Sequence, residues 1–146
     1  MKNNDLIEIL LVEDNPNDAE LALRAFRKNN IGNNICWVKD GLEALDLVMC
    51  REKYEGRDTS NYPKLILLDL KLPKMSGLEL LRTLKSKEKT KFIPIVVLTS
   101  SKEEKDVINS YMLGVNSYVV KPVKFEDFIK IVSDLVLYWM TTNKLP

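Results

Sequence analysis

The chain alternates five short apolar runs with longer amphipathic stretches, and this alternation constrains its fold more than any other feature. The runs consist mainly of Ile, Leu and Val, and most of them lack the period-two pattern of a half-exposed strand. Strands that are buried on both faces of a parallel sheet have this composition. We therefore predict strands at Ile7–Val12, Ile35–Val38, Leu65–Leu68, Ile93–Leu98 and Ser117–Val120.

The stretches between these runs carry apolar residues at helical spacing. The first helix, for example, is predicted from the i, i+3, i+4, i+7 pattern of Ala19, Ala22, Leu23 and Phe26. Five strand–helix units without internal repeats predict an α/β fold, in which helices cover both faces of a doubly wound parallel sheet. Ligands of such sheets bind beyond the carboxyl ends of the strands.

The sequence also indicates where some helices begin and end, and it contains two unusual segments. Asn15 before Pro16 predicts a capped helix start, and Gly114 predicts a helix end. A polar connection at about 50–64 is long for such a unit, and we interpret it as a surface insertion or, alternatively, a partner-contacting loop. The last helix, expected at about 125–142, carries apolar residues beyond one stripe.

Length, charge and composition exclude several classes of function. The 146 residues suit one domain, 1–146, and 22 basic against 21 acidic residues give no argument for a nucleic-acid surface. No apolar run approaches the ~20 residues that span a membrane, and the two cysteines are expected to be free thiols in a cytoplasmic protein. The chain has no histidine, which excludes intrinsic histidine catalysis and histidine-ligated zinc.

Acidic residues follow two of the predicted strands. Glu13 and Asp14 follow the first strand, and Asp69 follows the third. If these strands are neighbours, three carboxylates meet at one sheet edge, where their mutual repulsion calls for a cation. Oxygen ligands without Cys or His favour Mg²⁺. Because Mg²⁺ also coordinates phosphate oxygens, the cluster points to phosphate chemistry.

A hydroxyl and an amine follow the remaining strands at the same edge. Thr99 ends the fourth apolar stretch, and Lys121 follows the fifth, directly before Pro122. A hydroxyl can donate to a phosphate oxygen and a lysine supplies a positive charge. Each residue also has an ordinary explanation: the acids as helix caps, the threonine as a cap, the lysine as a solvated side chain. The combination and its order favour a phosphate site.

These residues resemble the receiver domain of two-component response regulators. The resemblance rests on ILLVEDNPND, LILLDLKLPKMSG, the Leu98-Thr99-Ser100 turn and SYVVKP, and it covers essentially the whole chain. It implies a flavodoxin-like (βα)5 sheet with strand order 2-1-3-4-5. It also implies a signalling protein that catalyses its own phosphorylation and dephosphorylation and is not a conventional enzyme.

The resemblance assigns a role to each site residue. Asp69 would be the phosphoryl acceptor, Lys121 would pair with the phosphoryl group, and Thr99 would move toward it. Mg²⁺ would be held by Glu13, Asp14, Asp69 and the backbone carbonyl of Lys71. Tyr118 would rotate with Thr99 as a switch residue, and the bond to Pro122 would be cis.

The resemblance also implies partners. The donor would be a sensor histidine kinase or a histidine phosphotransfer protein, which would supply the imidazole that this chain lacks. No output domain is visible, so the chain looks like a stand-alone regulator, of the kind that serves phytochromes. We expect a switching surface around the fourth helix, fifth strand and fifth helix. We expect a homodimer through this face, because the last helix carries extra apolar residues: Ile131, Tyr138 and Trp139.

Three alternatives are weighed against this interpretation. An aspartate-nucleophile phosphatase of the haloacid-dehalogenase type would need a second acid at position 71, where this chain has Lys. A flavodoxin or nucleotide binder would need a phosphate-binding loop after the first strand. The segment at that position, EDNPND, is acidic and would repel phosphate without a metal ion. The third alternative is a degenerate receiver that acts as a phosphorylation-independent binding module.

Overall fold

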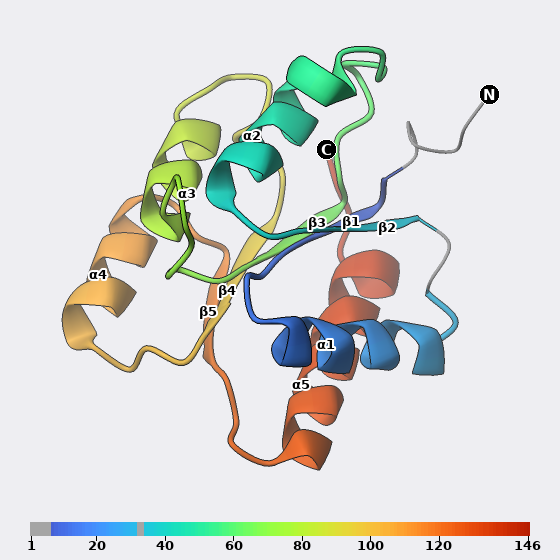
Figure 1. Cartoon of the computed structure of the whole chain (residues 1–146), viewed down its shortest axis with the longest axis vertical. Coiled ribbons are helices and arrows are strands. Elements are labelled where there is room, and N and C mark those ends of the chain that lie inside the picture. Colours follow the sequence, from blue (N-terminus) through green and yellow to red (C-terminus); the bar gives the residue numbers. More distant parts are fainter. Residues whose placement is uncertain (1–6, 32–33) are drawn as a thin grey trace.

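The strands form one parallel sheet in the order β2-β1-β3-β4-β5. The computed structural model describes residues 7–31 and 34–146, and it confirms the predicted flavodoxin-like fold class. Figure 1 shows the sheet crossing the middle of the molecule between its helices. The strands are β1 (Ile9–Val12), β2 (Ile35–Val38), β3 (Leu65–Leu68), β4 (Ile95–Thr99) and β5 (Ser117–Val120).

Three strands have the predicted boundaries, and two are shifted. β1 begins at Ile9 rather than Ile7. β4 runs from Ile95 to Thr99 rather than from Ile93 to Leu98. The shift of β4 follows from Pro94, which has no N–H to donate to a neighbouring strand. The amide of Ile93 instead donates to the Thr90 carbonyl in a turn, at 3.0 Å.

Helices cover both faces of the sheet. α1 and α5 pack together on one face, and α2, α3 and α4 lie on the other (Figure 1). Their bounds are α1 (Pro16–Lys28), α2 (Gly41–Met49), α3 (Gly77–Lys85), α4 (Glu104–Met112) and α5 (Phe125–Leu137). Within the described residues, no helix is both long and apolar enough to cross a membrane.

The core divides into two clusters because successive strand residues point to opposite faces. In β1, Leu10 and Val12 belong to the cluster under α2 and α3, whereas Ile9 and Leu11 belong to the cluster under α1 and α5. β3 and β4 alternate in the same way. All these residues are buried, so each strand is apolar on both faces. This explains the continuous apolar runs of the sequence.

Side chains cap the starts of α1, α2 and α3. The Asn15 side chain accepts hydrogen bonds from the amides of Asn17 and Asp18 at the start of α1. Ser76 caps α3 by accepting from the Glu79 amide. Gly114, with φ +99°, follows the end of α4 as predicted. These caps fix the loops that carry the acidic residues.

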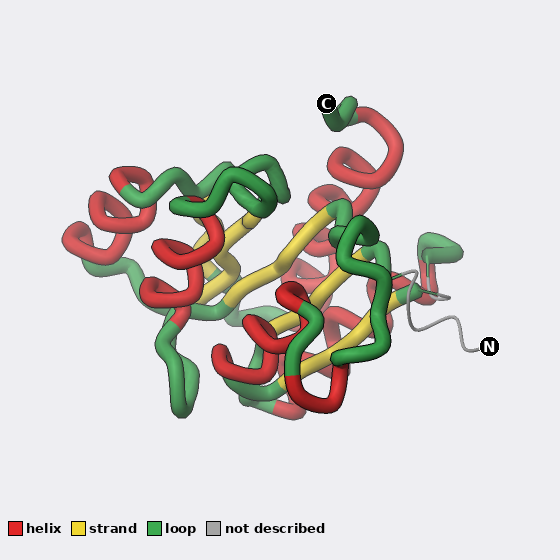
Figure 2. The backbone as a smooth tube through the Cα atoms, turned by 90° about the horizontal axis from the view of Figure 1, so that it is seen from above, coloured by secondary structure: helices red, strands yellow, loops and turns green. Residues whose placement is uncertain are grey.

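The connection at 50–64 is held by a buried arginine. Arg57 is 6% exposed, and its guanidinium donates to the Leu47 carbonyl at 2.5 Å and to the Asn61 carbonyl at 3.0 Å. The connection also contains a 3₁₀ turn at Glu52–Tyr54. At the other end of the chain, α5 continues into a π-helical turn at Tyr138–Thr142. In Figure 2 this end of the chain runs on beyond the strands.

Candidate functional site

Three carboxylates meet beyond the carboxyl ends of β1 and β3. The two strands pair in parallel with Val12 opposite Leu68, so the acids that follow them lie side by side. One carboxylate oxygen from each of Glu13, Asp14 and Asp69 lies within 4.8 Å of the others. The structure therefore brings together the three acids that the sequence analysis singled out.

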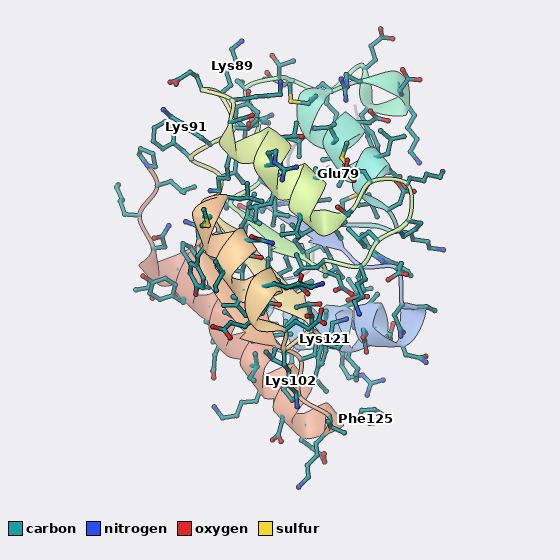
Figure 3. All side chains as sticks on the ribbon, turned by 90° about the vertical axis from the view of Figure 1, so that its left-hand side faces the viewer. Glu79, Lys89, Lys91, Lys102, Lys121 and Phe125 are labelled. Atoms are coloured by element: carbon teal, nitrogen blue, oxygen red, sulfur yellow. The ribbon has the colours of Figure 1, made fainter. Side chains whose placement is uncertain are left out.

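Lys121 lies among these acids, at the end of β5. Its ammonium nitrogen is 2.8 Å from Glu13 Oε1, 3.1 Å from Asp69 Oδ2 and 2.8 Å from Asp18 Oδ2. Its backbone amide donates to the Thr99 carbonyl at 2.7 Å, which anchors its position beside β4. In Figure 3 Lys121 is near α1 and just below the middle of the view, whereas Lys89 and Lys91 are near its top.

Backbone hydrogen bonds fix the orientation of the two most buried acids. Glu13 Oε2 accepts from the amide of Asn15 at 3.1 Å. The backbone carbonyl of Glu13 accepts from the indole Nε1–H of Trp37 at 2.8 Å. Asp69 Oδ1 accepts from the amide of Leu70 at 2.7 Å. The second oxygen of Asp69 faces Lys121, so this carboxylate and the positive charge are held close together.

The site carries more acid than its lysine can neutralise. Burial raises the pKa of Glu13 to about 7, the neighbouring Asp69 adds to this, and Lys121 opposes it. Burial alone would lower the pKa of Lys121, but its hydrogen bonds to Asp18 and Glu13 and the charge of Asp69 outweigh it and raise the pKa above its ordinary value. Lys121 is therefore a charged ammonium.

The donor set fits a hard divalent cation. All three side chains offer carboxylate oxygens, which suit Mg²⁺ or Mn²⁺ rather than zinc. The Lys121 ammonium already contacts two of the three acids in the position of a stand-in cation. Lys71 lies in the exposed part of the loop after Asp69, and the role of its carbonyl as a ligand stays a prediction.

The two predicted switch residues are linked through one loop residue. Thr99 is fully buried at the end of β4, and its hydroxyl oxygen accepts from the amide of Ser101 at 3.4 Å. The Tyr118 hydroxyl donates to the carbonyl of Ser101 at 3.0 Å. The Ser101 hydroxyl in turn donates to Asp106 of α4 at 2.6 Å. This chain of contacts connects the end of β4 to α4.

One expectation about the site is wrong in this structure. No peptide bond within residues 7–31 and 34–146 is cis, so the bond between Lys121 and Pro122 is trans. The cis isomer was expected from the resemblance to receiver domains. The ammonium reaches Glu13 and Asp69 from the trans isomer, which is favoured by about 0.5–1 kcal/mol in the absence of other constraints.

The contacts of Asp18, of Ser101 with Asp106, and of Trp37 were not predicted from the sequence. Asp18 lies three residues after the capping residue Asn15, in the first turn of α1. This spacing is typical of an acid in a capped helix, so Asp18 did not stand out. The contact between Trp37 and Glu13 depends on the pairing of β1 with β2, which the sequence does not mark.

Comparisons with known proteins identify the family. A family model described as the response regulator receiver domain matches residues 9–133. The chain is 41% identical over 138 residues to the response regulator Rcp1 of Synechocystis sp., covering 94% of this chain and 92% of that protein. It is 40% identical over 146 residues to a probable methanogenesis regulatory protein, FilR2, of Methanothrix harundinacea, covering 100% and 92%. The chain belongs to the response regulator receiver domain family.

Solved structures agree with this assignment. The Mn²⁺-bound form of response regulator Rcp1 superposes with a TM-score of 0.87 at 40% identity, covering 94% of this chain and 97% of that one. The phosphorylated cyanobacterial phytochrome response regulator RcpA gives 0.88 at 38% identity, covering 94% and 96%. Proteins similar to this one have thus been solved with a divalent metal ion and with a phosphoryl group. The three carboxylates of this chain are close enough together to hold a metal ion.

Proposed function

We propose that Asp69 accepts a phosphoryl group from a phosphohistidine of a sensor histidine kinase or phosphotransfer protein. The observation that carries this proposal is the placement of Asp69 at the end of β3. There one carboxylate oxygen faces the Lys121 ammonium at 3.1 Å and the side chain belongs to the three-acid cluster. RcpA, a structural relative, was solved in phosphorylated form, which supports the same role here.

The transfer requires one nucleophile and one compensating charge from this chain. A carboxylate oxygen of Asp69 forms a bond to phosphorus while the bond from phosphorus to the donor imidazole breaks, and the imidazole leaves with the electron pair. The chain has no histidine, so the imidazole belongs to the partner. Lys121 neutralises the phosphoryl oxygens, because its ammonium is already in contact with the acceptor.

Mg²⁺ is the proposed cofactor. Asp14 and Asp69 would bind it directly, Glu13 through water and Lys71 through its backbone carbonyl. A bound divalent cation would neutralise charge on the phosphoryl group during transfer. The oxygen-only donor set supports this choice, and so does the Mn²⁺-bound form of Rcp1.

The proposed output is a change in a protein-interaction surface. A phosphoryl group adds about −2 charge at the sheet edge, and we propose that Thr99 and Tyr118 move in response and shift α4 through Ser101 and Asp106. The face built by α4, β5 and α5 carries exposed apolar side chains: Ile108, Tyr111, Met112, Val123 and Phe125. We propose that a second copy of the chain covers this face.

We propose that residues 1–146 form one receiver domain and that the connection at 50–64 is a surface insertion. Of the three apolar residues expected to support a dimer, Trp139 packs against the core under α1 and α5, Ile131 is partly buried, and Tyr138 is half exposed. The dimer proposal therefore rests on α4 and the start of α5 more than on the end of the last helix.

Phosphoryl labelling tests the central proposal. After incubation with Mg²⁺ and acetyl phosphate, intact mass should rise by one phosphoryl group in the wild type and stay unchanged in Asp69→Asn. Asp134→Asn is a matched control, because Asp134 is an exposed aspartate of α5 paired with Lys130, and it should label normally. Labelling of Asp69→Asn would exclude Asp69 as the acceptor. A wild type that never labels would favour the phosphorylation-independent binding module.

A further inference from the structure

Asp18 makes an ion pair with Lys121 that helix capping does not explain. Asp18 is in the first turn of α1, and its Oδ2 is 2.8 Å from the Lys121 ammonium, 103 positions away in the sequence. An acid at this position of a helix commonly accepts a hydrogen bond from the amide of the capping residue. Here the Asn15 amide donates to Glu13 instead, and Asp18 reaches across to β5.

We propose that Asp18 is a positioning residue that holds the Lys121 ammonium beside Asp69 while the divalent cation occupies the acidic cluster. This inference rests on the proposed phosphoryl-acceptor function and adds a residue to it. Asp18 is not one of the three acids that form the cluster. Its side chain is 27% exposed, against 4% for Glu13 and 10% for Asp69, so it lies at the open side of the ammonium.

The three partners of Lys121 divide into two kinds. Glu13 and Asp69 belong to the cluster, so a cation there competes with the ammonium for their oxygens. Asp18 lies outside the cluster, and its contact with Lys121 is compatible with a bound cation. Asp18 therefore gives the ammonium a counter-charge that frees Glu13, and it keeps the amine near the atom that receives the phosphoryl group.

Removal of the Asp18 charge should consequently weaken metal binding. In Asp18→Asn, Lys121 keeps Glu13 and Asp69 as its charged partners and competes with the cation more strongly. Glu20→Gln controls for the loss of one negative charge from α1, because Glu20 is on the same helix and pairs with Arg27 on the exposed surface, at 2.9 Å.

The test measures Mn²⁺ affinity from the electron paramagnetic resonance signal of free Mn²⁺, in the absence of phosphodonor. Asp18→Asn should bind about fivefold more weakly than the wild type, the order expected for one screened charge contact. Glu20→Gln should stay within about twofold, and Asp18→Glu should regain most of the lost affinity. Equal affinities for Asp18→Asn and Glu20→Gln would overturn the proposal.

A Lys121→Met background distinguishes positioning from direct metal ligation. If Asp18 acts through the ammonium, Asp18→Asn should have no larger effect than Glu20→Gln in this background. A fivefold loss that persists without Lys121 would overturn the proposal and make Asp18 a ligand. A wild type that binds no Mn²⁺ would overturn the metal site itself. A wild type that binds Mn²⁺ and labels, with an unaffected Asp18→Asn, would remove only the role of Asp18.

Discussion

The indole nitrogen of Trp37 is 2.8 Å from the backbone carbonyl of Glu13, to which it donates a hydrogen bond. Trp37 is in β2 and Glu13 directly follows β1, so the bond links an aromatic ring to a backbone group of the acidic site. The Lys39 ammonium also lies 5.1 Å from the centre of this ring. The ring is half-buried, so its emission responds to changes in local polarity.

Trp37 should therefore report on metal binding. Addition of Mg²⁺ should change the fluorescence of the wild type, because Glu13 loses its contact with Lys121 and the hydrogen-bonded ring senses the new charge. The chain has two tryptophans, and Trp139 packs in the core under α1 and α5. The Mg²⁺ response should remain in Trp139→Phe and disappear in Trp37→Phe. A response carried by Trp139 would contradict this assignment.

The stability of the metal-free protein should depend on pH through Glu13. Burial raises its pKa to about 7 in the folded protein, against 4.5 in the unfolded chain. Between these pH values the folded protein keeps a proton that the unfolded chain has lost, so stability falls as pH rises from 4.5 to 7. The contribution is up to about 3 kcal/mol.

Urea unfolding in the presence of a chelator checks this dependence. The difference in unfolding free energy between pH 5 and pH 7.5 should shrink in Glu13→Gln, because the amide does not titrate. Glu20→Gln, which removes an exposed carboxylate, should leave the difference unchanged. If wild type and Glu13→Gln show the same pH profile, Glu13 is not the group responsible.

Gly77 should be required for the geometry around Asp69. A Cβ atom at this position would lie 2.3 Å from the carbonyl oxygen of Asp69 and 2.6 Å from the Cα atom of Leu70, both backbone atoms. Gly77→Ala should thus displace the loop after β3, destabilise the protein by about 2 kcal/mol and slow labelling. Gly56→Ala is the control, because a Cβ there meets nothing within 4 Å. Equal thermal stability of the two variants would contradict the prediction.

The exposed apolar residues of α4 should determine self-association. Sedimentation of the wild type at increasing concentration, with and without acetyl phosphate and Mg²⁺, should reveal a dimer. Met112→Glu should weaken the dimer at least about tenfold, since it places a charge in an apolar interface. Leu42→Glu changes an exposed apolar residue of α2 outside this face and should have little effect. A wild type that stays monomeric throughout would remove the dimer.

The parts of the fold that follow from local patterns were predictable. The apolar runs identified all five strands, because a strand buried on both faces leaves a continuous apolar segment. Glu13, Asp14 and Asp69 could be placed together because parallel strands end at one edge of the sheet. Lys121 was predicted at the same edge, although the cis bond expected next to it is trans.

Contacts between side chains of separate elements could not be predicted from the sequence. Asp18 has the spacing of a helix-cap acid, and only the position of β5 relative to α1 turns its carboxylate toward Lys121. The link from Thr99 and Tyr118 through Ser101 to Asp106 depends likewise on how the loop after β4 folds. Such contacts join residues from separate elements and leave no periodic signal in the sequence.

The arginine that holds the connection at 50–64 limits how this segment can be exchanged. Arg57 donates to the Leu47 carbonyl near the end of α2 at 2.5 Å, and the Cys50 amide donates to the same carbonyl at the longer distance of 3.3 Å. Chimeras that replace residues 51–63 with a shorter loop would lose the hydrogen bond from the Arg57 guanidinium to this carbonyl, so their melting temperature is expected to fall unless the graft supplies another donor there. Insertion of a foreign sequence into this segment is therefore expected to lower the thermal stability of the protein.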